Sequence, residues 1–177
     1  MNIYIIRHGQ VPNNVRKIKI YNNDDEDLTN EGINQAINLR EKIKQIDYDI
    51  IISSPLKRTT QTAEIINIKN KEIIFDDRLK ERNPGNLHHI PKNYVNREEY
   101  WNFNSKLQYG TSENMRNFFG RVYDFIEDLK KKNYKNVIIV SHSGVSKAFS
   151  AYFQGINDGK FLEHGLKNCE MKEYRLE

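Results

Sequence analysis

The chain has 177 residues, of which 37% are hydrophobic, with a formal net charge of +4 and an isoelectric point near 9.0. This length suits one domain with a sizeable core, and no apolar run approaches the roughly 20 residues that a membrane-spanning helix needs. The single cysteine, Cys169, excludes an intrachain disulfide and is typical of a reducing compartment. We therefore expect a single domain over residues 1–177 that is cytoplasmic and has no membrane partner.

The excess of basic residues is small and has an ordinary structural explanation. Basic surfaces can attract nucleic acid or small anions. The run Lys130–Lys132, however, falls at the end of a predicted helix, where cations complement the helix dipole. Solvated, lysine-rich helices account for the rest of the charge. We expect no nucleic-acid partner, and the composition leaves a homodimer open.

The first part of the chain alternates apolar runs with amphipathic segments. Residues 3–6 are predicted to form a short buried strand, and residues 10–27 are polar and irregular. Thr29 is the predicted N-cap of a helix over residues 30–46, whose apolar residues recur at helical spacing. The unbroken apolar run at residues 49–53 indicates a strand that is buried on both faces of a parallel sheet.

The middle of the chain continues this pattern and then loses it. Pro55 suits the first turn of a helix that extends to about residue 68, and residues 72–75 are predicted to form a third strand. Residues 76–111 are the least regular stretch. A loop of this length is usually functional or contains small helices. We expect its variable part, residues 83–111, to act as a lid over a site.

The last part of the chain returns to alternating elements. Ser112 is predicted to cap an amphipathic helix that ends near residue 132, followed by a buried strand at 137–140. A helix over 145–154 and a final strand over 167–176 complete the chain. Because strands and helices alternate along most of its length, the predicted fold class is α/β, a three-layer α/β/α sandwich with a mainly parallel central sheet.

Three of the predicted strands end in polar residues that can take part in chemistry. These ends are Arg7-His8-Gly9, the run Ser53–Arg58 and the run Ser141–Gly144. The carboxyl ends of parallel strands lie on one edge of a sheet, where open α/β proteins bind their ligands. We therefore expect two arginines and two histidines to converge there: Arg7, His8, Arg58 and His142.

Such a group of side chains favours a phosphate ligand. Two guanidinium groups hold a tetrahedral oxyanion through forked donors, and a helix that begins near Gly144 adds backbone N–H groups. A neutral imidazole can attack phosphorus in line and form a phosphohistidine. Taken singly, a histidine at a strand end is more often structural. Four such residues at matching strand-to-helix turns argue for a site.

The order and spacing of these segments resemble the histidine phosphatase superfamily, in its phosphoglycerate mutase-like branch. The resemblance extends over residues 3–145, and Asn168 before the last strand is also similar. It implies a phosphoglycerate mutase-like fold and phosphoryl-transfer activity. The matching segments are Arg7-His8-Gly9 with Asn14, Leu28–Gly32 with Gln35-Ala36, Ser53–Arg58 with Gln61-Thr62-Ala63, Leu79-Lys80-Glu81, and Ser141–Val145.

The resemblance also implies a role for each catalytic residue. His8 is the nucleophile that takes the phosphoryl group. Glu81 matches the acidic residue that protonates the leaving oxygen, and it must carry a proton to do so. The phosphate oxygens are held by three further side chains, namely Arg7, Arg58 and His142.

Four more residues are expected to contact the substrate. Asn14 matches a further phosphate contact, and Glu113 matches a glutamate that lies near the site in many family members. Ser143 and Gly144 lie at the start of the predicted phosphate-binding helix.

The chain departs from the family pattern around the expected pocket. Gln10 stands where the family usually has glutamate, and the run Leu87–His89 replaces a usual aromatic-Glu-Gly run. Val11 and Asn22 depart from the pattern as well. These departures affect the assignment of the substrate and leave the core catalytic groups in place.

We expect no metal and no cofactor. The arginines supply the positive charge that a metal would otherwise bring to the phosphate. His88 and His89 could be taken for metal ligands, but adjacent side chains are expected to point in different directions. In addition, no acidic residue or cysteine stands at ligand spacing from them.

The expected activity is therefore that of a metal-independent phosphomonoesterase of the histidine acid phosphatase type. Its partner would be a small phosphorylated metabolite, hydrolysed through a phosphohistidine on His8. Cofactor-dependent mutases of this family are longer and close an extended insertion over the substrate, which favours the phosphatase. Phosphoglycerate mutase-type transfer remains the first alternative, and a non-catalytic phospho-ligand-binding module the second.

Overall fold

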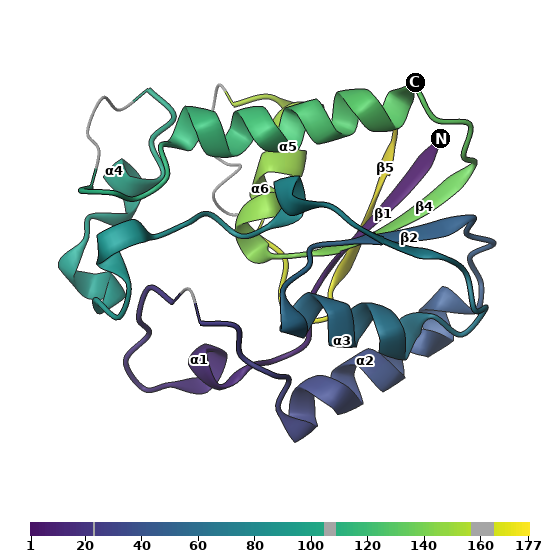
Figure 1. The fold of residues 1–177 in the computed structure, drawn as a ribbon, viewed down its shortest axis with the longest axis horizontal. Coiled ribbons are helices and arrows are strands. Elements are labelled where there is room, and N and C mark those ends of the chain that lie inside the picture. Colours follow the sequence, from purple (N-terminus) through teal and green to yellow (C-terminus); the bar gives the residue numbers. More distant parts are fainter. Residues whose placement is uncertain (23, 105–108, 157–164) are drawn as a thin grey trace.

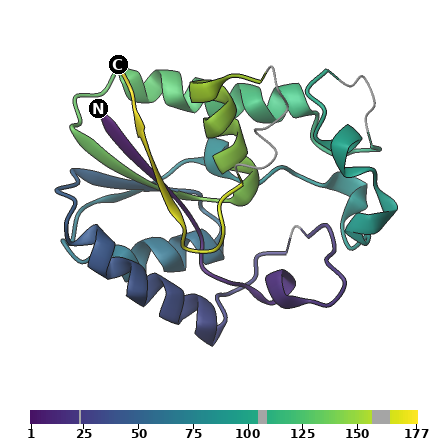
Figure 2. The same cartoon turned by 180° about the vertical axis from the view of Figure 1, so that it is seen from behind.

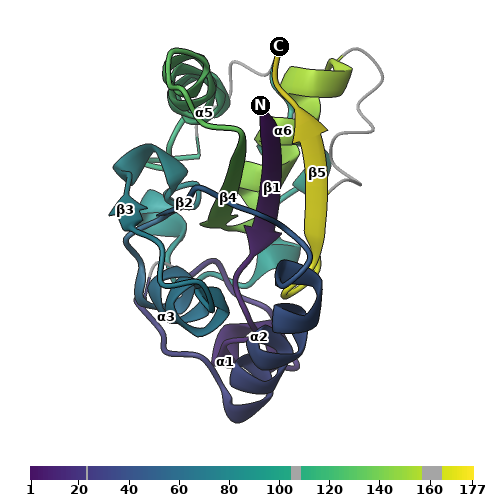
Figure 3. The ribbon, with the colours of Figure 1, turned by 90° about the vertical axis from the view of Figure 1, so that its right-hand side faces the viewer.

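Five strands form one sheet that is covered by helices on both faces (Figure 1). The structure is a computed structural model, and it describes residues 1–22, 24–104, 109–156 and 165–177. The strand order is β3-β2-β4-β1-β5, which Figure 3 shows side by side. Four strands are parallel, and β5 runs antiparallel to β1. The strands are β1 (Asn2–Arg7), β2 (Ile50–Ser53), β3 (Ile73–Phe75), β4 (Asn136–Ser141) and β5 (Met171–Arg175).

The helices form the two outer layers, which confirms the predicted three-layer α/β fold. Helices α2 (Asn30–Ile43) and α3 (Lys57–Ile66) cover one face of the sheet, and α5 (Met115–Lys130) and α6 (Ser143–Gln154) cover the other. Figure 2 shows the same layers from behind. Each face of the sheet has its own buried apolar cluster.

The central strands explain why the apolar runs are unbroken. Successive side chains of a strand point to opposite faces. In β4, Val137 and Ile139 belong to the cluster under α5 and α6, whereas Ile138 and Val140 belong to the cluster under α2 and α3. Both sets are fully buried. A strand between two helical layers therefore needs an apolar residue at every position.

Two predicted helix starts are wrong, and local hydrogen bonds explain why. Helix α3 begins at Lys57 with Leu56 as its N-cap, so Pro55 lies outside the helix. The chain uses these residues to leave the sheet, where the amide of Ser54 still donates to the carbonyl of Val140. Helix α5 begins at Met115, and its cap is Asn114, whose side chain accepts from the amide of Arg116.

Ser112, the predicted cap of α5, is buried two residues before the true cap. Its amide donates to the carbonyl of Tyr109 within the preceding turn. The helix start thus shifts toward the residue whose side chain reaches a free amide of the first turn.

Helix α6 begins two residues earlier than predicted, which matters for the site. Its first residue is Ser143 and its N-cap position is His142. The imidazole of His142 is therefore fixed at the junction between strand β4 and the helix. Helix α2 ends at Ile43, three residues before the predicted end.

The irregular stretches gather beyond the carboxyl end of the sheet, on the left of Figure 1. Helix α1 (Pro12–Val15), which the α1–α2 loop (residues 16–29) follows, lies below α4 (Arg97–Tyr100) in Figure 1. The segment 83–111, here called the lid segment, contains α4 and two short 3-10 helices, η2 (Gly85–Leu87) and η3 (Lys92–Tyr94). Another 3-10 helix, η1 (Asp77–Leu79), precedes it.

Backbone hydrogen bonds join the α1–α2 loop to the lid segment. The amide of Tyr21 donates to Ile90, and the amide of His89 donates back to Tyr21. Lys92 donates to Lys19 in the same way. The two segments therefore form a continuous rim on one side of the sheet edge. Among the described residues, no helix is both long and apolar enough to cross a membrane.

Candidate active site

A pocket of about 370 Å³ opens at the carboxyl edge of the sheet, between the strand ends and the rim. This volume suits a small metabolite. Arg7, His8, Arg58 and His142 all line it, so the four residues predicted to converge do so. Of the remaining predicted site residues, those that also line the pocket are Asn14, Glu81, Ser143 and Gly144.

His8 is oriented for nucleophilic attack. It follows β1 directly and is 5% exposed. Its Nδ1 lies 2.7 Å from the carbonyl oxygen of Gly9. A carbonyl only accepts, so Nδ1 carries the hydrogen and Nε2 keeps a free lone pair. Burial, and then the charges of Arg58 and Arg7, hold the pKa of His8 well below its usual range.

Two arginines supply positive charge beside this imidazole. Arg58 lies in the first turn of α3 and is 7% exposed, with Nη1 donating to the carbonyl of Asp24 at 3.2 Å. Arg7 is the last residue of β1, and its Nη1 donates to the carbonyl of Leu166 at 2.9 Å. The Nε atom of Arg7 is buried and has no hydrogen-bond partner within the described residues. A bound oxyanion would satisfy it.

His142 presents a second buried donor. Its Nε2 lies 2.9 Å from the hydroxyl oxygen of Ser54, while its Nδ1 is buried and lacks a partner in the described part of the chain. If the Ser54 hydroxyl donates to Nε2, Nδ1–H is left to donate to a ligand. The His142 ring lies 5.3 Å from the His8 ring. Burial, and then Arg58 and His8, hold the pKa of His142 well below its usual range.

Glu81 also lines the pocket, and two backbone amides hold its carboxyl group. The amide of Gly144 donates to Oε2, and the amide of Arg82 donates to Oε1, each over 2.9 Å. The sequence predicts that the N–H of Gly144 binds phosphate. In the structure, this N–H donates to the carboxyl group of Glu81 instead. The start of α6 orients Glu81.

Asn14 and Asn168 are hydrogen-bonded to each other, and Asn168 also contacts the backbone of the nucleophile. The Nδ2 atom of Asn168 donates to the carbonyl of His8 and to Oδ1 of Asn14, both over 3.0 Å. Oδ1 of Asn14 also accepts from the amide of Val11. With its oxygen occupied in this way, Asn14 has its amide nitrogen as the remaining donor for a ligand.

Comparison with known proteins places this site in a family. A family model described as "Histidine phosphatase superfamily (branch 1)" matches residues 3–177. The chain belongs to this family. The resemblance seen in the sequence is thereby confirmed over almost the whole chain.

Relatives with different printed functions match the chain over most of their length. "Phosphoserine phosphatase 1" of Hydrogenobacter thermophilus is 30% identical over 86% of this chain and 76% of its own. "Probable phosphoglycerate mutase GpmB" of Escherichia coli is 33% identical over 97% of this chain and 83% of its own. The crystal structure of an α-ribazole phosphatase from Shigella flexneri superposes with a TM-score of 0.86 at 24% identity. The superposition covers 100% of this chain and 91% of the α-ribazole phosphatase chain, which shows that the two share a fold.

Glu113 is the predicted site residue that the structure does not bring to the pocket. It is absent from the pocket lining, and its carboxylate binds Arg121 twice, at 2.7 and 3.0 Å, and the amide of Asn83. Arg121 in turn donates to the carbonyls of Lys80 and Glu81. Glu113 thus supports the backbone that carries Glu81.

Sequence reasoning missed the basic residues Lys19, Arg82 and Lys147, which line the pocket. Arg82 is buried, with its guanidinium 3.8 Å above the ring of Tyr100. Lys147 is 7% exposed, with its ammonium 4.2 Å above the ring of Trp101. Burial lowers the pKa of Lys147 to about 8. The sequence did contain a signal for Lys147, because a lysine among the small and apolar residues of α6 indicates a buried charge.

The expected geometry of His88 and His89 is wrong. Their rings lie 3.7 Å apart, and both Nε2 atoms approach the carboxylate of Asp24, at 3.3 and 3.1 Å. Asp24 is therefore an acidic partner within reach, although it lies 64 positions earlier than His88 in the chain. His89 adopts a left-handed backbone with φ of 66°, which turns its side chain to the same side as that of His88.

Proposed function

We propose that this protein is a metal-independent phosphomonoesterase that hydrolyses a small phosphorylated metabolite through a phosphohistidine on His8. The observation that carries the proposal is the state of His8: a buried, neutral imidazole with Nδ1–H bound to Gly9 and its Nε2 lone pair free. Nearby, Nε of Arg7 and Nδ1 of His142 are buried and lack a hydrogen-bond partner among the described residues. Membership of the histidine phosphatase superfamily supports the same reading.

The proposed first step transfers the phosphoryl group to the enzyme. Nε2 of His8 attacks phosphorus, an N–P bond forms and the bond to the leaving oxygen breaks. Glu81 gives its proton to that oxygen. Arg7, Arg58 and His142 stabilise the charge on the remaining oxygens, which is the main demand of phosphoryl transfer.

The proposed second step releases phosphate. Glu81, now a carboxylate, takes a proton from water, and the water oxygen attacks phosphorus as the N–P bond breaks. His8 returns to its neutral form and Glu81 to its protonated form. Neither step needs an ion, since the arginines supply the positive charge.

The experiment is hydrolysis of p-nitrophenyl phosphate by the wild type, His8→Ala and His8→Asn, with EDTA present. We expect activity in the wild type alone. We also expect an acid-labile phosphoryl label on the wild-type chain after rapid quenching, and none on either variant. Equal background rates in all three proteins would instead favour a non-catalytic phospho-ligand module. Wild-type activity lost on adding EDTA would exclude the metal-free mechanism.

Further cations in the pocket favour a substrate with a second anionic group. Lys92, Arg97 and Lys147 all line the pocket. A carboxylate on the phosphorylated metabolite could reach these cations while its phosphate contacts His8. The name of the phosphoserine phosphatase relative is consistent with this substrate class.

Phosphoserine and phosphoethanolamine test this preference, because they differ by the carboxylate alone. We expect phosphoserine to have the higher kcat/KM. Lys147→Gln should raise the KM for phosphoserine about tenfold and leave the KM for phosphoethanolamine unchanged. Lys172→Gln is the matched control, because Lys172 also lies over an aromatic ring, that of Tyr174, but is not among the pocket-lining residues. Equal kcat/KM for both substrates would remove the carboxylate from the proposal.

A phosphoglycerate mutase-type activity is the second candidate, and the 33% identity to the GpmB protein favours testing it. A mutase must keep its phosphohistidine from water and return the phosphoryl group to a bound intermediate. Incubation with 3-phosphoglycerate and 2,3-bisphosphoglycerate separates the two. Fast isomer exchange without phosphate release would overturn the phosphatase assignment.

A further inference from the structure

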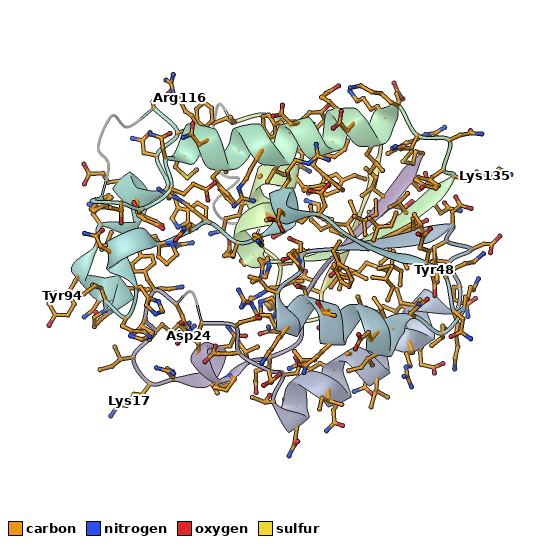
Figure 4. The ribbon with its side chains drawn as sticks, viewed as in Figure 1. Lys17, Asp24, Tyr48, Tyr94, Arg116 and Lys135 are labelled. Carbon is orange, nitrogen blue, oxygen red and sulfur yellow. The ribbon has the colours of Figure 1, made fainter. Side chains whose placement is uncertain are left out.

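We infer that Asp24, which lines the pocket, forms with His88 and His89 a binding site for one divalent transition-metal ion of the Zn²⁺ class. The site is separate from the catalytic groups and does not rest on the proposed phosphatase activity. Figure 4 labels Asp24 on the α1–α2 loop, where this loop faces the lid segment.

The three side chains offer a suitable set of donor atoms. Imidazole nitrogen and carboxylate oxygen are common zinc ligands, and two histidines with one carboxylate form a well-known zinc donor set. The three candidate ligand atoms all lie within 4.8 Å of one another. A tetrahedral ion with bonds of about 2.0–2.1 Å separates its ligands by about 3.4 Å. Nε2 of His88 lies 3.3 Å from Oδ1 of Asp24, and Nε2 of His89 lies 3.1 Å from Oδ2. Each imidazole is therefore about that far from its own carboxylate oxygen, and a small rotation of the carboxylate would present one oxygen to both.

The backbone holds this arrangement in place. Adjacent side chains of an extended segment diverge, but the left-handed conformation of His89 brings the two rings together at 3.7 Å. A non-glycine residue in this region costs of order 1 kcal/mol and persists where its surroundings impose it. Here the amide of His89 is fixed by the carbonyl of Tyr21.

The surroundings leave room for the ion. The side chains of His88, His89 and Asp24 are 33%, 60% and 48% exposed, so water can complete the coordination shell. Cys169 offers no competing thiolate, because burial raises its pKa to about 12.

The site is coupled to the pocket through one residue. The carboxylate of Asp24 faces the two histidines, and its backbone carbonyl accepts a hydrogen bond from Arg58. Arg58 is one of the residues proposed to hold the phosphate oxygens. A bound ion would therefore tie the α1–α2 loop to the lid segment directly beside the phosphate site.

The test is Zn²⁺ binding to the chelator-treated full chain, measured by competition with a chromogenic chelator and by calorimetry. We expect one tight equivalent in the wild type. The double variant His88→Gln/His89→Asn should lose at least about tenfold in affinity, as should Asp24→Asn. Asparagine suits position 89 because it tolerates the left-handed backbone. Circular dichroism and thermal unfolding check that each variant is folded.

Matched variants locate the ion. Asp25→Asn changes a neighbouring carboxylate, His8→Ala removes an imidazole of the catalytic pocket, and His164→Gln removes the histidine outside the described residues. All three should keep the tight equivalent. Absence of that equivalent from the wild type would mean that the cluster is a pair of His–Asp hydrogen bonds only. Unchanged binding in the double variant, or loss in His8→Ala or His164→Gln, would place the ion elsewhere and overturn the inference.

Discussion

The backbone amide of Gly144 donates a 2.9 Å hydrogen bond to Oε2 of Glu81, so the first turn of α6 orients the candidate acid. This contact requires glycine. A Cβ atom at position 144 would lie 2.0 Å from Oε1 of Glu81 and 3.0 Å from the ring of Trp101. The position of Glu81 is therefore set by a residue 63 positions away in the chain.

Gly144→Ala should displace Glu81 and slow the reaction. A shift of about 1 Å in a reacting group can cost about 10²-fold in rate, so we expect kcat for an alkyl phosphate to fall by about 10–100-fold. Gly120→Ala is the control, because a Cβ at position 120 in α5 meets nothing within 4 Å. Steady-state kinetics on both variants check this. A wild-type kcat in Gly144→Ala would show that the contact does not position the acid.

Glu81→Gln should slow alkyl phosphates far more than aryl phosphates. A general acid contributes about 10²–10⁴-fold, and its loss matters most when the leaving oxygen is strongly basic. We expect a loss of this size for phosphoserine and a much smaller one for p-nitrophenyl phosphate. Glu98→Gln, in an exposed position of α4, is the control. Equal losses with the two substrates would remove Glu81 from the role of acid.

The buried histidines should make the protein less stable as the pH falls below about 6.5. The pKa values of His8 and His142 are lower in the folded chain than the usual value of 6.5, chiefly because of burial. Below 6.5 the unfolded chain therefore binds more protons than the folded one. The free energy of unfolding then rises with pH, by up to about 1.4 kcal/mol per pH unit for each histidine.

Urea unfolding between pH 5 and 7 measures this slope, and His142→Gln should reduce it. The remaining slope in that variant reports His8 and the other groups that titrate in the window. An identical slope in the wild type and in His142→Gln would contradict the prediction.

Glu113→Gln should affect stability more than substrate binding. It breaks the two-point contact with Arg121, which supports the carbonyls beside Glu81, and we expect a loss of about 1–3 kcal/mol in the free energy of unfolding. KM should stay within about twofold of the wild type, because Glu113 lies outside the pocket lining.

Glu127→Gln provides the comparison for this measurement. It removes an exposed carboxylate that pairs with Lys130 and accepts from the hydroxyl of Tyr152, and such surface contacts contribute little to stability. A large rise in KM for Glu113→Gln, with stability unchanged, would return Glu113 to the substrate site.

The sequence alone determined the layers and the centre of the site. Strands between two helical layers need apolar residues throughout, so β2 and β4 were visible as unbroken apolar runs. Parallel strands end at one edge, which is why the convergence of Arg7, His8, Arg58 and His142 followed from their places at the strand ends.

The tertiary structure alone decided which loop residues meet. In the structure, Glu113 pairs with Arg121 outside the pocket, and Lys147 lines the pocket. His88 and His89 contact Asp24. A regular element repeats with a fixed period, so its buried positions can be counted along the chain. Contacts between two irregular segments have no period. They depend on how each backbone turns, as at His89, and on which distant side chain packs beside it.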